Sequence, residues 1–184
     1  NAKADQEAYR LLQQTAYPSW LYPVVHGATT IWERLDGYTV EKGFGGHNGM
    51  NSFNHYSFGA IGSWMYNHSL GIERDEDNPG FKHFILQPEH DPTGQMTWAK
   101  GHYDSMYGRI ESSWEIKEGV RNYRFWVPSN TTATLHLQAT GANMISEGNR
   151  PLESSKDIQI VNEKDGKVIM KLQSGEYQFI VNEE

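Results

Sequence analysis

The period of the hydrophobic pattern changes once along the chain, and this change constrains the fold more than any other feature. Before about residue 80, apolar side chains recur at helical spacing, as Ala8, Leu11 and Leu12 do. After that point they alternate with polar residues, as in the run from Tyr123 to Val127. The sequence therefore predicts two parts of different architecture rather than one uniform layer.

The first part is expected to contain three helices. The first covers Asp5 to Thr15 and stops before Pro18, because the residue before a proline avoids the helical region. The second covers Ala28 to Leu35, where the apolar residues recur at i, i+3 and i+7. The third covers Ser52 to Leu70, and Gly71 is well placed to end it.

A charged segment without periodicity, Arg74 to Gly80, separates the two patterns and ends in a Pro-Gly turn dipeptide. We therefore expect two domains, residues 1–80 and residues 81–184. At 184 residues, the chain is long enough for two small domains.

The second part is expected to be an antiparallel β-sandwich of seven or more short strands. The alternating runs are separated by turn dipeptides, of which Asp165-Gly166 is a strong hairpin signal. Five runs alternate clearly: Ile110–Ile116, Tyr123–Val127, Ala133–Leu137, Val168–Leu172 and Tyr177–Val181. In phase with its neighbours, Trp114 should point into the core, whereas Trp126 should face outward.

Composition excludes several classes of function. The net charge of −7, without a basic stripe, argues against a nucleic-acid partner. No apolar run is long enough to span a membrane, and the absence of cysteine excludes disulfides and thiolate metal sites. The eight histidines have no metal-ligand spacing, so we expect neither a metal nor a cofactor. The sequence does not indicate a cellular compartment.

Because the chain starts at Asn1 without a methionine, we expect a piece of a longer protein.

Glu33 is the first candidate for chemistry. In a helix from Ala28 to Leu35, Glu33 would share a face with Thr29, away from the apolar stripe. A carboxylate beside Trp32 could activate water as a general base. From the pattern alone, a solvated surface carboxylate next to Arg34 is the more frequent outcome.

His55 and a glycine-rich loop are weaker signals. His55 stands near the start of the third expected helix, where it could contact a sugar, although helix capping by Ser52 or Asn54 is the plainer interpretation. The loop Gly43–Gly49 does not follow the strand that a phosphate-binding loop needs and lacks its Gly-Lys ending. We interpret its glycines as a sharp turn of the backbone.

An ordered set of motifs resembles bacterial α-L-rhamnosidases. The motifs cover most of the chain and thin out after about residue 140. They are Tyr17–Trp20, Gly27–Arg34, Asn51–Tyr56, Pro79–Phe84, Leu86–Pro88, Trp98-Ala99, Tyr103–Gly108 and Pro128–Ala133. The resemblance implies an α + β chain in two parts: a helical segment from the end of an (α/α)₆ catalytic barrel, followed by a C-terminal antiparallel β-sandwich.

The resemblance also implies roles for individual residues. Enzymes of this family cleave terminal rhamnose with inversion, which requires a general acid and a general base. Glu33 looks like the base, and His55 matches a histidine that lines the sugar site. Trp32 stands where an aromatic wall is expected, and Trp20 is a weaker candidate for substrate binding. The family's general acid lies before the stretch represented here, so the chain alone is expected to be inactive. Its partners would be a rhamnose-containing carbohydrate and the remainder of the parent enzyme.

Three alternatives remain open. The sandwich could be a non-catalytic carbohydrate-binding module that uses Trp98, Trp114 or Trp126. The helical part could belong to another glycosidase or to a phosphorylase with the same barrel. Residues 81–184 could instead be a purely structural domain that supports the barrel.

Overall fold

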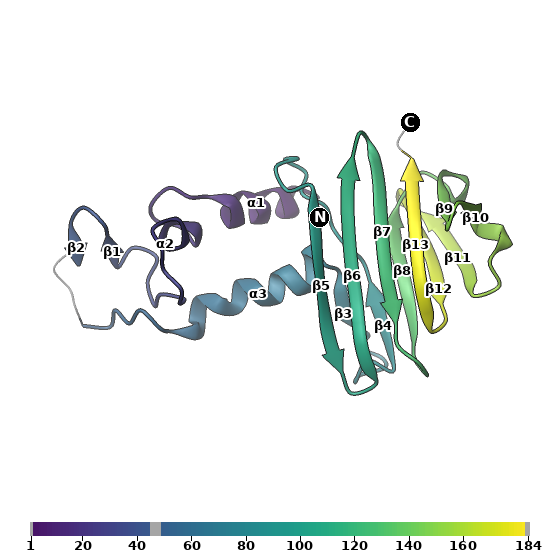
Figure 1. The fold of residues 1–184 in the computed structure, drawn as a ribbon, viewed down its shortest axis with the longest axis horizontal. Coiled ribbons are helices and arrows are strands. Elements are labelled where there is room, and N and C mark those ends of the chain that lie inside the picture. The colour runs from purple at the N-terminus through teal and green to yellow at the C-terminus, as the bar shows by residue number, and fades with distance from the viewer. Residues whose placement is uncertain (1, 45–48, 183–184) are drawn as a thin grey trace. The chain divides into compact units, whose positions relative to one another are not determined.

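The computed structural model describes residues 2–44 and 49–182, which form two compact units (Figure 1). Unit 1 runs to Trp64 and includes the separate segment Asp91–Gln95. Unit 2 consists of Met65–His90 and the chain from Met96 onward. Among the described residues, no helix is both long and apolar enough to cross a membrane.

Unit 1 contains the helices of the chain's first part. They are α1 (Ala2–Gln13), α2 (Leu21–Val25), the 3₁₀ turn η1 (Tyr56–Gly59) and α3 (Ala60–Trp64), after which the π-helical turn η2 (Met65–Ser69) opens unit 2. Helix α1 buries Tyr9 completely, and the Tyr9 ring meets Trp64 edge-on at 5.0 Å. The first and third expected helices are therefore confirmed, but the third begins at Tyr56 rather than Ser52.

The helix predicted over Ala28–Leu35 is wrong. This segment is irregular, and its backbone forms hydrogen bonds with the residues just before η1. The Glu33 N–H donates to Ser52 O at 2.9 Å, and the His55 N–H donates to Ile31 O at 2.8 Å. Consecutive β-branched residues, Thr29 to Ile31, disfavour a helix. The argument that Glu33 faces away from a helical apolar stripe fails with that helix. A short helix, α2, precedes the segment instead.

A two-stranded hairpin of β1 (Tyr38–Thr39) and β2 (Gly43–Phe44) follows that segment. Gly43 has a φ of +66°, a conformation that glycine adopts without strain. The expected glycine-rich loop begins here, but its residues 45–48 lie outside the described residues.

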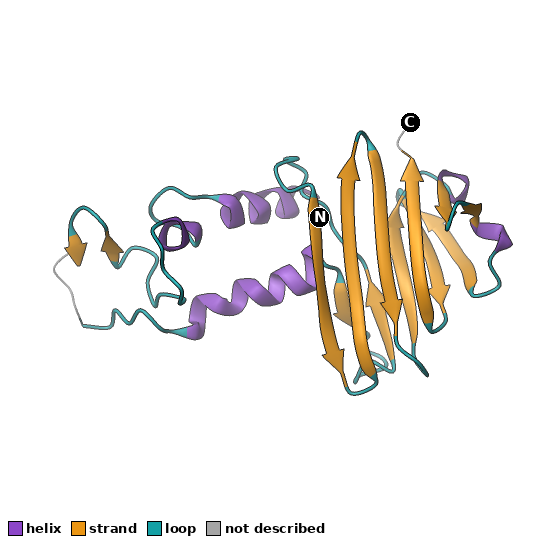
Figure 2. Ribbon diagram, in the orientation of Figure 1, coloured by secondary structure: helices purple, strands orange, loops and turns teal. Residues whose placement is uncertain are grey.

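Unit 2 is a sandwich of two sheets (Figure 2). The six-stranded sheet has the order β10-β9-β13-β7-β6-β5, and the five-stranded sheet has the order β11-β12-β8-β4-β3. The strands are β3 (Ile72–Arg74), β4 (His83–Leu86), β5 (Trp98–Ser105), β6 (Gly108–Lys117), β7 (Val120–Val127), β8 (Thr132–Gln138), β9 (Ile145–Glu147), β10 (Arg150–Pro151), β11 (Ile158–Lys164), β12 (Lys167–Leu172) and β13 (Gly175–Asn182). Two short 3₁₀ turns, η3 (Ala142–Met144) and η4 (Leu152–Ser154), flank β9 and β10.

The predicted strands and turns are confirmed in detail. The dipeptides Glu118-Gly119 and Asp165-Gly166 both have positive φ at both residues, as tight hairpins between right-twisted strands require. The inward residues of both sheets, such as Phe125, Leu135 and Phe179, are fully buried in one core. Buried residues alternate with more exposed ones along the strands that carry these three residues, and this is the two-residue period from which the sequence predicted the sandwich.

The sandwich is not wholly antiparallel. Strands β4 and β8 pair in parallel, with Phe84 opposite Ala133, whereas every other described pair of strands is antiparallel. Parallel neighbours need a long crossover, and here the whole β5–β7 meander lies between them in sequence. Strand β3 lies before the expected division at residues 80 and 81 and pairs with β4 after it.

Candidate active site

The candidate site forms where two segments of unit 1 run side by side. The backbone bonds between Glu33 and Ser52 and between His55 and Ile31 join the two segments. Thr30 adds a side-chain bond from its hydroxyl to the carbonyl of Phe53. Glu33 and His55, which are far apart in sequence, therefore stand on adjacent backbones. Helical periodicity alone could not have predicted this.

The Glu33 carboxylate has a fixed orientation. Its Oε2 accepts a hydrogen bond from the Ser52 N–H at 2.7 Å, so the same pair of residues is bonded twice. Its neighbour Arg34 points its guanidinium at Asp36, with Nε at 3.1 Å and Nη2 at 3.2 Å from the two carboxylate oxygens. This bond lowers the pKa of Asp36 and raises that of Arg34. Because Arg34 is engaged with Asp36, Glu33 has no ion-pair partner among the described residues.

His55 presents one ring nitrogen to its surroundings. It caps η1, and its Nδ1 accepts the Ser57 N–H at 3.3 Å. An Nδ1 that accepts places the proton of a neutral imidazole on Nε2, which is then a donor. The ring lies parallel to the exposed Tyr56, 5.6 Å away. The capping expected from Ser52 or Asn54 is thus supplied by His55 itself, which keeps a free N–H.

Trp32 is the central member of an aromatic cluster. It is 8% exposed and packs against Tyr38 at 5.7 Å and Phe53 at 4.8 Å, while Phe44 stacks on Phe53 at 5.2 Å. The cluster holds the Glu33 segment against the β1–β2 hairpin. Trp20 is separate: it is partly buried, and its indole N–H donates to the Phe58 carbonyl at 3.1 Å. Trp20 has therefore used its only donor and can offer a ligand only its ring.

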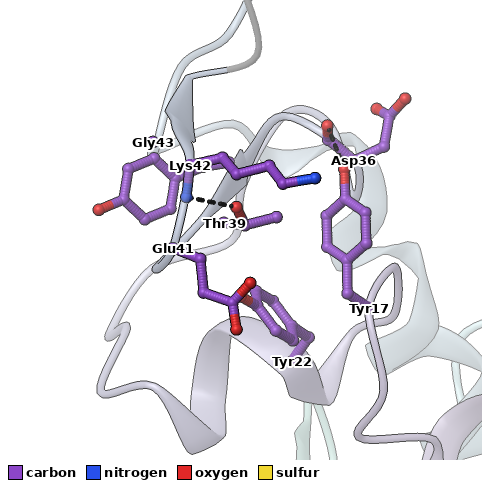
Figure 3. Close-up of a pocket in the computed structure, with 8 residues that line it drawn as sticks. Tyr17, Tyr22, Asp36, Thr39, Glu41, Lys42 and Gly43 are labelled. Atoms are coloured by element: carbon purple, nitrogen blue, oxygen red, sulfur yellow. Dashed lines mark hydrogen bonds between the residues drawn. The ribbon is translucent and has the colours of Figure 1, made fainter.

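A hollow of about 390 Å³ is lined in part by Tyr38 of this cluster. Figure 3 shows Tyr17, Tyr22 and Asp36 among the other lining residues. The Tyr17 hydroxyl donates to the Asp36 carbonyl at 2.8 Å, and the Tyr22 hydroxyl accepts the Val40 N–H at 3.2 Å. Aromatic faces next to hydroxyls and charged groups suit a sugar. The lining residues are Tyr17, Tyr22, Asp36, Tyr38, Thr39, Glu41, Lys42 and Gly43.

Sequence reasoning missed Ser52 and Ser57 as the residues that orient Glu33 and His55. Their only signal was the polar run before the third helix, which was interpreted as capping. Within residues 2–44 and 49–182, no group of three or more His, Asp or Glu side chains is arranged to hold a metal ion.

Comparisons with known proteins converge on one family. Residues 1–69 match the model described as the bacterial alpha-L-rhamnosidase 6 hairpin glycosidase domain, and residues 71–150 match the bacterial alpha-L-rhamnosidase C-terminal domain. A curated alpha-L-rhamnosidase of Formosa agariphila is 36% identical over 93% of the chain, and one of Streptomyces avermitilis is 33% identical over 95%. The chain spans only 18% and 16% of these relatives.

Solved structures agree. The crystal structure of the Streptomyces avermitilis alpha-L-rhamnosidase complexed with L-rhamnose superposes with a TM-score of 0.82 at 32% identity, covering 96% of this chain and 16% of that one. The alpha-L-rhamnosidase from Dictyoglumus thermophilum gives a TM-score of 0.78 at 29% identity, covering 97% of this chain and 19% of that one.

Proposed function

The chain belongs to the bacterial α-L-rhamnosidase family, and from this premise we propose that it supplies the general base of a glycosidase that cleaves terminal α-L-rhamnosides with inversion. The observation that carries the proposal is the pair of hydrogen bonds between Glu33 and Ser52, which hold the Glu33 carboxylate next to the segment that carries His55. Residues 1–69 contribute to the catalytic barrel, and the sandwich is its C-terminal domain.

Glu33 acts on water. With Oε2 held by the Ser52 N–H, Oε1 stays available, because no described residue donates to it. The water that attacks the anomeric carbon gives a proton to this oxygen, while the leaving oxygen takes a proton from the general acid. Inverting enzymes hold the two carboxyls about 6.5 to 9.5 Å apart so that the water fits between them.

In this proposal, His55 and Trp20 contact the sugar directly, and Trp32 supports the sugar site from behind. The Nε2–H of His55 donates to a rhamnose hydroxyl. Trp32 acts mainly through packing, since it is nearly buried and positions the Glu33 segment. Trp20 offers its ring face.

The general acid lies in the remainder of the parent enzyme, which we propose as the partner of this chain. Support comes from exposed apolar side chains in unit 1, which an isolated soluble unit would bury. These include Leu11, Val24, Val25, Met50 and Tyr56, the last of them 88% exposed. The 184 residues alone therefore hydrolyse no rhamnoside, and turnover of an aryl α-L-rhamnoside by the purified chain would refute this part.

The test of Glu33 uses the parent enzyme and an aryl α-L-rhamnoside. Glu33→Gln keeps the shape and removes the base, so kcat should fall by about 10²-fold or more. Azide, a nucleophile that needs no base, should restore turnover and give the β-configured rhamnosyl azide. Glu7→Gln is the matched control, because Glu7 is an exposed carboxylate on α1 paired with Arg10. Activity of Glu33→Gln within a few-fold of wild type would reject Glu33 as the base.

A further inference from the structure

The outer face of the six-stranded sheet carries a second hollow, of about 350 Å³, in unit 2. Strands β5, β6, β7 and β13 form its floor, and they lie side by side in Figure 1. The register places Trp98 opposite Glu115, and Lys100 opposite Ser113, which in turn faces Arg124. The lining residues are Trp98, Ala99, Lys100, Ser113, Trp114, Glu115, Asn122, Tyr123, Arg124 and Gln178.

Trp98 presents an open aromatic ring at this hollow. It lies on β5, the edge strand of the sheet, and is 62% exposed. Because Trp98 alternates with the inward-facing Ala99, its ring belongs to the outer face. No described residue donates to, accepts from or stacks on this indole. Its apolar surface and its N–H are both available to a ligand.

The rest of the hollow is polar and carries charges of both signs. Lys100 has no ion-pair partner among the described residues, and Glu115 likewise has none, whereas Arg124 pairs with Glu176 at 3.2 Å. Asn122 and Gln178 add amide groups that both donate and accept. The lining holds two cations and one carboxylate, but Glu176 beside the hollow offsets the charge of Arg124, so this surface attracts a polyanion only weakly. A surface with both donors and acceptors suits a ligand covered with hydroxyls.

We propose that this face is a carbohydrate-binding site for a neutral oligosaccharide, separate from the candidate active site. The apolar face of one sugar ring stacks on Trp98, and its hydroxyls bond to Lys100, Glu115 and the two amides. A single exposed platform implies weak binding, with a dissociation constant of about 0.1 to 1 mM. The choice of a sugar rests on the proposed function, but binding here requires neither Glu33 nor hydrolysis.

The same sheet face provides its own control. Trp126 is also exposed, at 42%, but in register it stands between Glu111 and Glu176 and does not line the hollow. If any exposed tryptophan sufficed, Trp98 and Trp126 would contribute equally. The proposal requires that only Trp98 does.

The experiment is isothermal titration of the full 184-residue chain with short neutral rhamnan oligosaccharides. Trp98→Ala should weaken binding about tenfold or more, and Lys100→Met about three- to fivefold, while Trp126→Ala should change it less than twofold. The folded state of each variant is checked by circular dichroism.

Three outcomes would overturn the proposal: no binding by the wild type at millimolar sugar, equal losses from Trp98→Ala and Trp126→Ala, or tighter binding of galacturonate oligomers than of the neutral probe. Loss of this site would leave rhamnoside hydrolysis by the parent enzyme in place. Failure here and failure of the Glu33 assignment are thus distinguishable.

Discussion

Trp114→Phe should destabilise the sandwich strongly, because Trp114 anchors the chain at the start of unit 2. Trp114 is 2% exposed, and its indole N–H donates to the Ser69 carbonyl at 2.6 Å, with Ser69 itself buried. Phenylalanine leaves that carbonyl buried without its partner, which costs about 1 to 3 kcal/mol. The smaller ring leaves a gap in the packing that costs about 1 to 2 kcal/mol more.

The expected loss in the free energy of unfolding is therefore about 2 to 5 kcal/mol, or on the order of 10 °C in the midpoint of thermal unfolding. Urea unfolding followed by far-ultraviolet circular dichroism measures it. Trp126→Phe is the matched control, because the same exchange at a 42% exposed position should cost less than about 0.5 kcal/mol. If Trp114→Phe cost no more than Trp126→Phe, the anchoring argument would be refuted.

Two further predictions concern unit 2. His90 packs against Trp114 and Tyr123, and burial lowers its pKa to about 4. The folded state then binds fewer protons than the unfolded state. The stability that neutral His90 contributes is therefore complete above about pH 6.5 and is lost as the pH falls toward 4. Between pH 7 and pH 4.5, the free energy of unfolding should fall by up to about 3 kcal/mol more for wild type than for His90→Gln. Equal decreases in the two proteins would contradict this. Gly71 has a φ of +68°, and a Cβ there would meet the Gln87 carbonyl carbon at 2.1 Å. Gly71→Ala should cost more than about 2 kcal/mol in urea unfolding, against about 1 kcal/mol for Gly119→Ala, whose φ is +79° in open space; similar losses would show that the close contact relaxes.

The site illustrates the limits of local pattern. Ala28, Ile31 and Leu35 have helical spacing, yet the segment is irregular because its backbone groups bond to the segment from Ser52 to His55. The predicted helix is absent, so the argument that placed Glu33 on an outward helix face is wrong. The motifs identified Glu33 and His55 as candidates, but the pairing of two distant segments brought them to adjacent backbones.

The sequence by itself determined the two-part architecture, the strands between β6 and β13 with strong alternation, and the hairpins at Glu118-Gly119 and Asp165-Gly166. These features depend on neighbouring residues, because alternation and positive φ are local properties. It also predicted correctly that Trp114 faces the core and Trp126 the solvent.

Only the tertiary structure decided the parallel pairing of β4 with β8, the inclusion of Asp91–Gln95 in unit 1, and the bond that orients the Glu33 carboxylate. Asp91 is buried, and its Oδ2 accepts a hydrogen bond from Gln13 of α1, which is 78 positions away. Each of these contacts joins residues that are distant in the chain. No local period encodes which distant backbone will satisfy a given N–H or carbonyl, so this information appears only when the chain is folded.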